Sequence, residues 1–446
     1  MSRHRHAMPF GALITPEGVR FRLWAPASDR VELILDDGAL ELSQIGDGFW
    51  ELTTDRATAG TTYMYRADGG LEVPDPASRM QVDDVHGPSV VVDPEAFEWH
   101  DDDWRGRRWE EAVLYELHVG AFSPEGTFAG VEARLDHLVD LGVTAVELMP
   151  VADFPGARGW GYDGVLPFAP DRVYGAPDDL KALVHAAHDR GLMVLLDVVY
   201  NHFGPEGNYL HLYAPQFFTD RYTTPWGAAV DLSLRPVRDF FLHNALYWLS
   251  EYRFDGLRLD AVHAIHDQGP VHVVDEIAHA VREGPGTERR VHLVLENDDN
   301  AARFLPRGAD GLPVAATAQW NDDIHHVLHV LATGETDGYY ADFAEDPARA
   351  LLRCLTEGLV FQGDPSPYRG GEPRGEPSGH LPPAAFVSFA QNHDQVGNRA
   401  FGERLGELAP EEAVRAVETV LLLAPSPPLL FKIGRASCRE RVCHRV

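Results

Sequence analysis

The chain has 446 residues and a formal net charge of −31, from 38 basic and 69 acidic side chains. So large an acidic excess disfavours nucleic acid or an anionic membrane surface as a partner. The hydrophobic content of 44% is typical of a globular protein, and no apolar stretch approaches the roughly 20 residues of a membrane span. The three cysteines show no metal-binding or redox spacing, so we expect a reduced, cytoplasmic setting.

Residues 1–97 have the pattern of a small β-sandwich. Residues 19–35 and 61–69 alternate apolar and polar positions, and turn residues separate such segments. The stretches 73–80 and 87–99 look like an extended connector. We therefore predict an amino-terminal β-sandwich domain over 1–97.

From residue 112 onward, eight short apolar runs alternate with amphipathic helical patterns. Near-continuous apolar strands that alternate with helices are typical of a parallel sheet, and eight such units close a (β/α)8 TIM barrel. We predict this α/β barrel over residues 98–431. The eight runs are 112–122, 143–150, 191–200, 254–262, 291–298, 315–322, 384–394 and 427–433, and the clearest helices are 130–142, 177–191, 237–252 and 410–424.

Polar side chains follow several of these runs where each strand is expected to end. In a (β/α)8 barrel, the carboxyl ends of the strands meet on the face where active sites are built. Arg258 and Asp260 are two residues apart, so the period of a strand places them on one face. Carboxylates from three runs would converge there, which is more than a structural salt bridge needs. The side chains are Asp197, Asn201, His202, Arg258, Asp260, His263, Glu296, His393 and Asp394.

Four of these segments resemble, in order, the four conserved regions of the α-amylase family of glycosidases, glycoside hydrolase family 13. A preceding aromatic segment also matches the family, and an amino-terminal segment is similar to the β-sandwich module of its starch- and glycogen-acting members. The segments are DVVYNH (197–202), GLRLDAVH (256–263), LENDDN (295–300), FAQNHD (389–394), WGYDGVLPFAPDRVYGAPDDL (160–180) and FRLWAPASDRVEL (21–33).

Within this family, residues 296–305, 318–343, 366–371 and 389–405 most closely resemble a subfamily that acts on malto-oligosyltrehalose. Its members cleave the α-1,4 bond next to a terminal trehalose unit and release trehalose. Two same-family alternatives remain open, a glycogen-branching and a debranching enzyme. A glucan-binding protein without activity is disfavoured, because binding alone would not need three carboxylates. The oligomeric state is left open.

The resemblance implies a role for each carboxylate. Asp260 corresponds to the nucleophile, Glu296 to the general acid/base, and Asp394 to the third carboxylate, which holds sugar hydroxyls and favours the distorted ring. Arg258 lies on the strand face of Asp260, so we expect it to lower the pKa of that carboxyl. Glu296 follows an apolar run, and apolar surroundings would raise its pKa as an acid requires.

The resemblance also implies a set of substrate-binding residues. His202 and His393 correspond to donors to the sugar before the cleaved bond, and Tyr162 to the aromatic platform under that sugar. Arg258 and His263 complete the predicted substrate-binding set.

No metal or cofactor is expected. Asn201 corresponds to a calcium-linked position in many amylases, but the other ligands of such a site are not evident in the sequence.

The carboxyl terminus departs from the family pattern. Phe431 is followed by KIGRASCRERVCHRV, in which five of fifteen residues are Lys or Arg and two are Cys. We therefore expect an atypical, foreign tail over 432–446, a barrel without its last helix, and a missing β-rich carboxyl-terminal domain. An inactive truncated fragment is accordingly another alternative, although all the motif residues are present.

Overall fold

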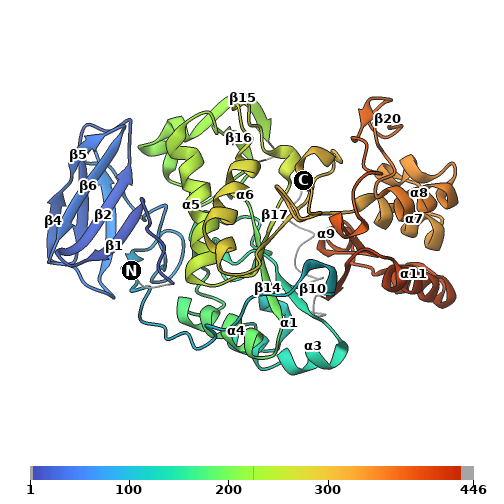
Figure 1. The fold of residues 1–446 in the computed structure, drawn as a ribbon. Coiled ribbons are helices and arrows are strands. Elements are labelled where there is room, and N and C mark those ends of the chain that lie inside the picture. The colour runs from blue at the N-terminus through green and yellow to red at the C-terminus, as the bar shows by residue number, and fades with distance from the viewer. Residues whose placement is uncertain (1–3, 225, 433–446) are drawn as a thin grey trace.

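The structure is a computed structural model that describes residues 4–224 and 226–432. Its amino-terminal strands form two antiparallel sheets with the orders β1-β2-β6-β5 and β4-β3-β7-β8, and β9 pairs with β7. This confirms the predicted β-sandwich (blue in Figure 1). The strands are β1 (Gly11–Thr15), β2 (Gly18–Trp24), β3 (Val31–Leu35), β4 (Gly38–Glu41), β5 (Ser43–Gly46), β6 (Phe49–Thr54), β7 (Thr62–Ala67), β8 (Glu72–Val73) and β9 (Ser89–Val90).

A closed parallel barrel follows the sandwich. Its strand order is β10-β11-β14-β17-β18-β19-β22-β23, and β23 pairs with β10 to close the ring. Each of the eight predicted apolar runs contains one of these strands, so the predicted barrel is confirmed. The strands are β10 (Leu114–Leu117), β11 (Ala145–Leu148), β14 (Met193–Val198), β17 (Gly256–Leu259), β18 (His292–Leu295), β19 (Ala318–Trp320), β22 (Phe386–Phe389) and β23 (Pro428–Lys432).

Helices and short hairpins connect the barrel strands (Figure 1). Three of the four clearest predicted helices are confirmed, as α4 (Pro177–Asp189), α5 (Arg235–Glu251) and α11 (Glu411–Leu423). The remaining elements are α1 (Val119–Phe122), α6 (Val273–Glu283), α7 (Asp322–Thr333), α8 (Pro347–Glu357), α10 (Leu405–Leu408), and the strand pairs β12 (Ala152–Asp153) with β13 (Leu166–Pro170), β15 (Phe218–Thr224) with β16 (Gly227–Val230), and β20 (Asp364–Pro365) with β21 (Pro373–Arg374).

The fourth predicted helix, 130–142, consists of two short helices. These are α2 (Phe128–Glu132) and α3 (Leu135–Leu141), and they are separated at Arg134, whose backbone (φ −115°, ψ 4°) is not helical. Phe128, Val131, Leu135 and Leu138 form the buried face of these two helices, as the apolar periodicity predicted, whereas Val139 and Leu141 are exposed. The periodicity did not report the turn, because the same apolar spacing continues across it.

The prediction of a strand over 384–394 was wrong for the last residues of that range. Strand β22 ends at Phe389, and His393 begins a short helix, α9 (His393–Gly397). The Asn392 side chain accepts a hydrogen bond from the Asp394 N–H at 2.9 Å, and the Asn392 N–H donates to the Gln395 side chain at 2.8 Å. This reciprocal cap starts a helix where the sequence pattern suggested a continuing strand.

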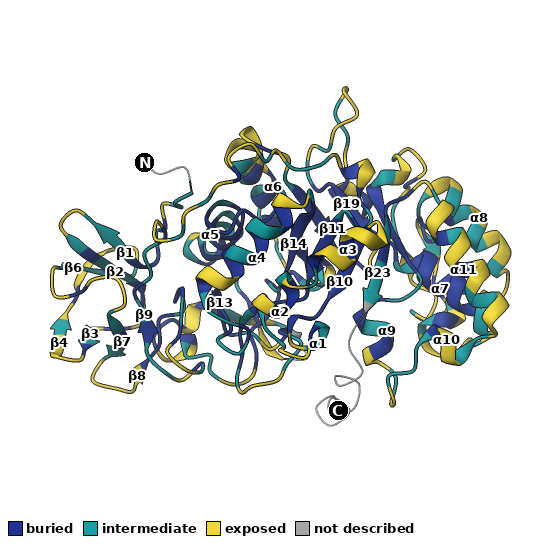
Figure 2. Ribbon diagram, turned by 90° about the horizontal axis from the view of Figure 1, so that it is seen from below, coloured by how far each residue is buried: buried dark blue, intermediate teal, exposed yellow. Residues whose placement is uncertain are grey.

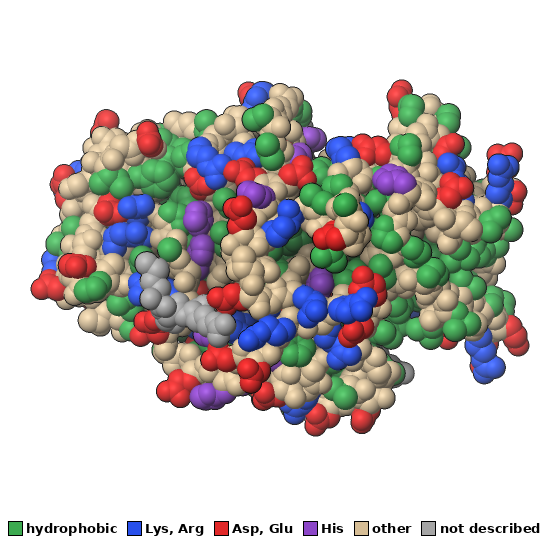
Figure 3. All heavy atoms as spheres, viewed as in Figure 1, with side chains coloured by type: hydrophobic (Ala, Val, Ile, Leu, Met, Phe, Trp, Pro, Cys, Tyr) green, Lys and Arg blue, Asp and Glu red, His purple; other side chains and the backbone are tan. Residues whose placement is uncertain are grey.

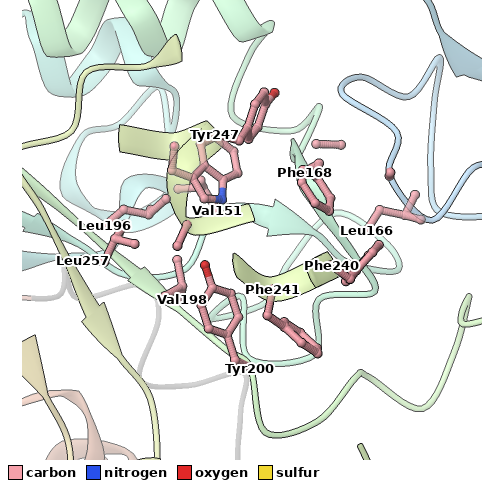
Figure 4. Close-up of a cluster of buried hydrophobic side chains, with 14 of the residues drawn as sticks. Val151, Leu166, Phe168, Leu196, Val198, Tyr200, Phe240, Phe241, Tyr247 and Leu257 are labelled. Carbon is pink, nitrogen blue, oxygen red and sulfur yellow. The ribbon is translucent and has the colours of Figure 1, made fainter. Parts of the chain in front are cut away.

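The barrel strands are almost entirely buried (dark blue in Figure 2). Helix α5 packs its aromatic side chains against β13 and β14, where Phe240, Phe241 and Tyr247 meet Phe168 and Val198 (Figure 4). Burial of such large rings is a major source of stability. Outside this core, acidic and basic side chains are interspersed over the face shown in Figure 3.

The segment after the sandwich is tied to the barrel by a buried ion pair. Arg79 Nη1 lies 3.2 Å from Glu251 Oε2 of helix α5, and both side chains are excluded from solvent. Phe10 and Phe240 add an edge-to-face aromatic contact with ring centroids 5.6 Å apart.

The eighth strand ends at Lys432, so the predicted atypical tail lies outside the described residues from position 433 on. The same holds for the predicted absence of a last barrel helix. The domain boundaries at 97 and 431 stay predictions. None of the helices within residues 4–224 and 226–432 has the length and apolar character needed to cross a membrane.

A buried ion-pair network lies at the amino-terminal end of β17. His188 of α4 contacts Asp101 through Nδ1 at 2.5 Å and Asp255 through Nε2 at 2.9 Å. Asp255 also accepts a hydrogen bond from Trp104 Nε1 at 2.7 Å. Burial alone would lower the pKa of His188, but the two carboxylates raise it. Charged His188 is therefore part of the folded structure.

We expect His188→Gln to lower the free energy of unfolding by about 3–5 kcal/mol near pH 6, because one partner of a buried ion pair is removed. The stabilisation by His188 is fully present below its ordinary pKa of 6.5 and is lost as pH rises through the raised pKa of the folded state. Urea unfolding should therefore show a smaller loss in alkaline buffer. An equal loss at all pH values above 6.5 would contradict this linkage.

Candidate active site

Arg258 lies at the centre of a cluster of carboxylates at the carboxyl ends of the barrel strands. Its Nη1 donates to Asp197 at 2.7 and 2.8 Å and to Asp260 Oδ1 at 2.7 Å. Its Nη2 donates to Glu296 Oε2 at 2.8 Å. The carboxylates come from β14, from the residue after β17 and from the residue after β18, which are neighbouring strands. One fully buried guanidinium thus holds three acidic groups together.

An aromatic ring supports the guanidinium from a fourth strand. The Cζ atom of Arg258 lies 4.2 Å from the ring centroid of Trp320, which ends β19. This is a cation–π contact in a buried setting, where such contacts are strongest. It fixes the plane of the guanidinium and thereby the directions of its two terminal nitrogens.

The backbone turns sharply directly after Asp260. Ala261 adopts a left-handed conformation with φ 41°, which is costly for a residue other than glycine. The turn directs the Ala261 N–H to Glu296 Oε2 at 2.8 Å, and the next N–H, of Val262, donates to the Glu296 carbonyl at 2.8 Å. The strained turn therefore fixes Glu296 relative to Asp260.

Burial raises the pKa of both central carboxyls, and Arg258 opposes the rise in each. Burial raises the pKa of Glu296 more than Arg258 lowers it, and the result is about 7. Burial also raises the pKa of Asp260 above its ordinary value, so the predicted net lowering was wrong, although Arg258 does oppose the rise. Near neutral pH, Glu296 can therefore hold a proton that it can donate, as a general acid must.

The predicted third carboxylate lies next to a charged histidine. His393 Nε2 is 3.5 Å from Asp394 Oδ1, at the start of α9. The Tyr162 ring stacks on the His393 ring with centroids 4.9 Å apart and planes inclined by 20°. The Tyr162 hydroxyl donates to Asp197 Oδ2 at 2.6 Å. Tyr162 thus connects the Arg258 cluster with the His393–Asp394 pair.

The other two predicted histidines, His202 and His263, differ in burial and in the residues that they contact. His202 is buried, donates from Nε2 to the Tyr162 carbonyl at 2.9 Å, and stacks on Trp226 with centroids 3.7 Å apart. His263 is exposed, and its Nδ1 accepts a hydrogen bond from the Asp298 N–H at 3.3 Å. His202 therefore adjoins the site through Tyr162, whereas His263 contacts the loop after β18. The binding roles of both stay predictions.

Three residues of the cluster were not in the predicted site. Asp197 was noted only as a polar side chain at a strand end, and Trp320 only as part of the segment 318–343 that resembles the subfamily. Glu116, inside the run 112–122, was not considered, although a carboxylate within a near-continuous apolar strand is itself a signal. Glu116 contacts His393 Nδ1 at 2.5 Å.

Within the described residues, no group of three or more His, Cys, Asp or Glu side chains is placed to hold a metal ion.

Family models match both parts of the chain. Residues 91–243 match the model "Alpha amylase, catalytic domain", and residues 9–84 match "Carbohydrate-binding module 48 (Isoamylase N-terminal domain)". The barrel and its carboxylate cluster thus define a catalytic domain of the α-amylase class behind a carbohydrate-binding module.

Similar proteins narrow this class. Malto-oligosyltrehalose trehalohydrolase from Saccharolobus solfataricus is 42% identical over 95% of this chain and 74% of that protein. A solved structure of a proposed α-amylase from Salmonella typhimurium is 50% identical, with a TM-score of 0.93 over 96% of this chain and 73% of that one. The chain belongs to the malto-oligosyltrehalose trehalohydrolase family. The branching enzyme of Corynebacterium jeikeium is 33% identical over 56% of this chain and 39% of that protein.

We expect Arg258→Leu to lower the free energy of unfolding by about 3–5 kcal/mol at neutral pH, because it leaves the buried Asp197 and the partly buried Asp260 and Glu296 without their cation. The loss should shrink in acid, where the carboxylates take up protons. The matched control is Arg415→Leu, which removes an exposed pair with Glu411 and should leave stability nearly unchanged. Urea unfolding at neutral and acid pH measures both. Equal losses in the two variants would contradict the central role of Arg258.

Proposed function

We propose that this protein hydrolyses the α-1,4-glucosidic bond next to the terminal trehalose of malto-oligosyltrehalose and releases trehalose. The observation that carries this proposal is the pair Asp260 and Glu296, held by the two terminal nitrogens of Arg258, with the pKa of Glu296 raised to about 7. The names of the similar proteins support the choice of substrate.

The strand register supports a retaining mechanism. Leu259 and Leu295 are the last paired residues of β17 and β18, so Asp260 and Glu296 follow on adjacent strands. Neighbouring strands lie about 4.8 Å apart, and retaining enzymes hold their two carboxyls about 5 Å apart. Asp260 would therefore act as a nucleophile, because no room is left for a water between it and the sugar.

The proposed reaction has two steps. Asp260 attacks the anomeric carbon while Glu296 protonates the departing oxygen, which leaves with trehalose, and a glucosyl ester forms on Asp260. A water molecule, deprotonated by Glu296, then breaks the ester, frees the shortened glucan with its original anomeric configuration and restores both carboxyls.

Asp394, His393 and Tyr162 would bind the sugar before the cleaved bond. The contacts of His393 with Asp394 and of Tyr162 with His393 group these side chains on one edge of the Arg258 cluster. Asp394 would accept hydrogen bonds from sugar hydroxyls, and the Tyr162 ring would support the face of the sugar.

A glycogen-branching enzyme is the second candidate, since the Corynebacterium jeikeium protein shares 33% identity with part of this chain. The two candidates differ in the acceptor, which is water in hydrolysis and a glucan hydroxyl in branching. Incubation with malto-oligosyltrehalose and with a linear glucan separates them. Hydrolysis frees a glucan with a new reducing end, whereas branching creates α-1,6 bonds without a net gain of reducing ends.

A cytoplasmic location is part of the same proposal. Cys354 is a buried free thiol, as expected of a protein kept under reducing conditions. Fractionation of the source cells tests this location.

We expect the protein to prefer maltotriosyltrehalose over maltopentaose by roughly ten- to several-hundred-fold in kcat/KM, because one or two buried polar groups would stay unpaired with the wrong sugar. The two substrates have the same number of glucose units and differ only in the last linkage. Initial rates of product release, separated by chromatography, give the ratio. Equal values would remove the trehalohydrolase proposal and leave the glycosidase one standing.

We expect Glu296→Gln to lose most activity on the natural substrate but much less on an activated aryl glycoside, whose leaving group needs no proton. Asp260→Asn is the matched control and should lose activity on both, because an amide cannot attack the anomeric carbon. In the unaltered protein, kcat/KM should fall as pH rises past about 7, when Glu296 loses its proton. A similar loss by Glu296→Gln on both substrates would contradict the acid role.

A further inference from the structure

His393 is held on its buried side by a carboxylate of the first barrel strand. Its Nδ1 lies 2.5 Å from Glu116 Oε1, and its backbone N–H donates to Glu116 Oε2 at 3.3 Å. Both side chains are buried. Because Nδ1 donates to Glu116, the opposite nitrogen, Nε2, is the atom that lies on the side of Asp394.

Aromatic rings fix the plane of this imidazole. Tyr162 stacks on one face of His393, and Trp160 approaches it edge-on at 90° with ring centroids 5.6 Å apart. Trp320 lies against it from β19 at 6.0 Å. The ring is therefore held by packing, and Glu116 determines which of its nitrogens carry protons.

A second glutamate on the neighbouring strand provides a contrast. Glu147 of β11 is the direct register partner of Glu116, and it is equally buried. Neither of its carboxyl oxygens has a hydrogen-bond partner among the described residues. Burial, together with the charge of Glu116, raises the pKa of Glu147 well above its usual range. Of this adjacent pair, Glu147 is thus the neutral acid, and Glu116 is the one that contacts His393.

We propose that Glu116 is a positioning residue that acts through His393. Its carboxylate keeps the imidazole doubly protonated, so that Nε2–H is a permanent donor to the sugar bound before the cleaved bond. The part of this inference that concerns the sugar rests on the proposed function.

The charges around His393 are consistent with this role. Burial and Arg258 oppose a second proton on the imidazole, whereas Asp394 and Glu116 favour it, and the pKa of His393 rises to about 9. The titratable and charged groups that face it are Glu116 of β10, Glu147 of β11, Tyr162 of the loop before β13, Asp197 of β14, Arg258 of β17 and Asp394 of α9.

Nuclear magnetic resonance of carbon-13-labelled histidine tests the inference without substrate. The His393 signal is identified by its loss in His393→Gln. It should titrate near pH 9 in the unaltered protein. Glu116→Gln should lower that pKa by about 1–3 units, because an adjacent opposite charge is removed. Glu147→Gln is the matched control and should leave it unchanged, because it replaces one neutral group by another.

Three outcomes would overturn the inference. The first is a His393 pKa at or below its ordinary value of 6.5 in the unaltered protein, which requires no variant to fold. The second is an equal fall of that pKa in Glu147→Gln and Glu116→Gln. The third concerns Glu116→Asp, which retains the charge and should lower the pKa less than Glu116→Gln does, so an equally large fall would contradict the inference.

The second measurement is the affinity for maltotriosyltrehalose. It is made in the Glu296→Gln variant, because this variant should not cleave the ligand during the measurement. Adding Glu116→Gln should weaken binding about tenfold as pH rises through the lowered pKa of His393, since one charge-assisted hydrogen bond is lost. Adding Glu147→Gln should leave binding as it is. If the Glu296→Gln protein does not bind maltotriosyltrehalose at all, the proposed function fails. The titration of His393 still tests the role of Glu116 in that case.

Discussion

One buried cation, the guanidinium of Arg258, determines both the geometry and the charge of the site. It contacts Asp197, Asp260 and Glu296 at 2.7 to 2.8 Å. Burying a guanidinium costs free energy that only such close carboxylates offset. One positive charge cannot fully offset the burial of three neighbouring carboxylates, so one of them can keep its proton. Burial and the charges of Asp260 and Asp394 raise the pKa of Glu296 to about 7, although Arg258 opposes the rise, so Glu296 can act as an acid near neutral pH.

The barrel supplies the rigidity that this arrangement needs. Asp197 and Arg258 are direct register partners on β14 and β17, and the register of β17 with β18 continues to Asp260 and Glu296. Positions fixed by a closed ring of backbone hydrogen bonds are more accurate than positions on loops. The left-handed Ala261 stands where two carboxyls from adjacent strands must meet. Its strain is offset by the N–H groups that it directs to Glu296.

Much of this architecture could be predicted from the sequence, because strand period and apolar runs report burial directly. The shared face of Arg258 and Asp260 followed from their spacing, and the contact between them confirms it. The pKa of Asp260 could not be predicted in the same way, since desolvation depends on the whole surrounding fold. Glu116 and Glu147 show the same limit. Glu116 contacts His393 and Glu147 has no hydrogen-bond partner among the described residues, and this contrast depends on a register between β10 and β11 that no single segment contains. The break at Arg134 was missed because it leaves the apolar spacing intact.

One side of the site is formed by the loop after β18, the start of α7 and the β20–β21 hairpin, and ion pairs join these segments. Asp298, two residues after Glu296, binds Arg369 at 2.6 Å and Arg374 at 2.9 Å, and both arginines lie between β20 and the end of β21. Arg374 also lies 3.0 Å from Asp323, in the first turn of α7, and both of these side chains are buried. Breaking this buried pair would leave a charge without a partner and would cost free energy, so these segments resist rearrangement. Under the proposed function, a wall that resists rearrangement would favour one shape of disaccharide over another. The chemistry itself depends on Asp260 and Glu296, which Arg258 holds.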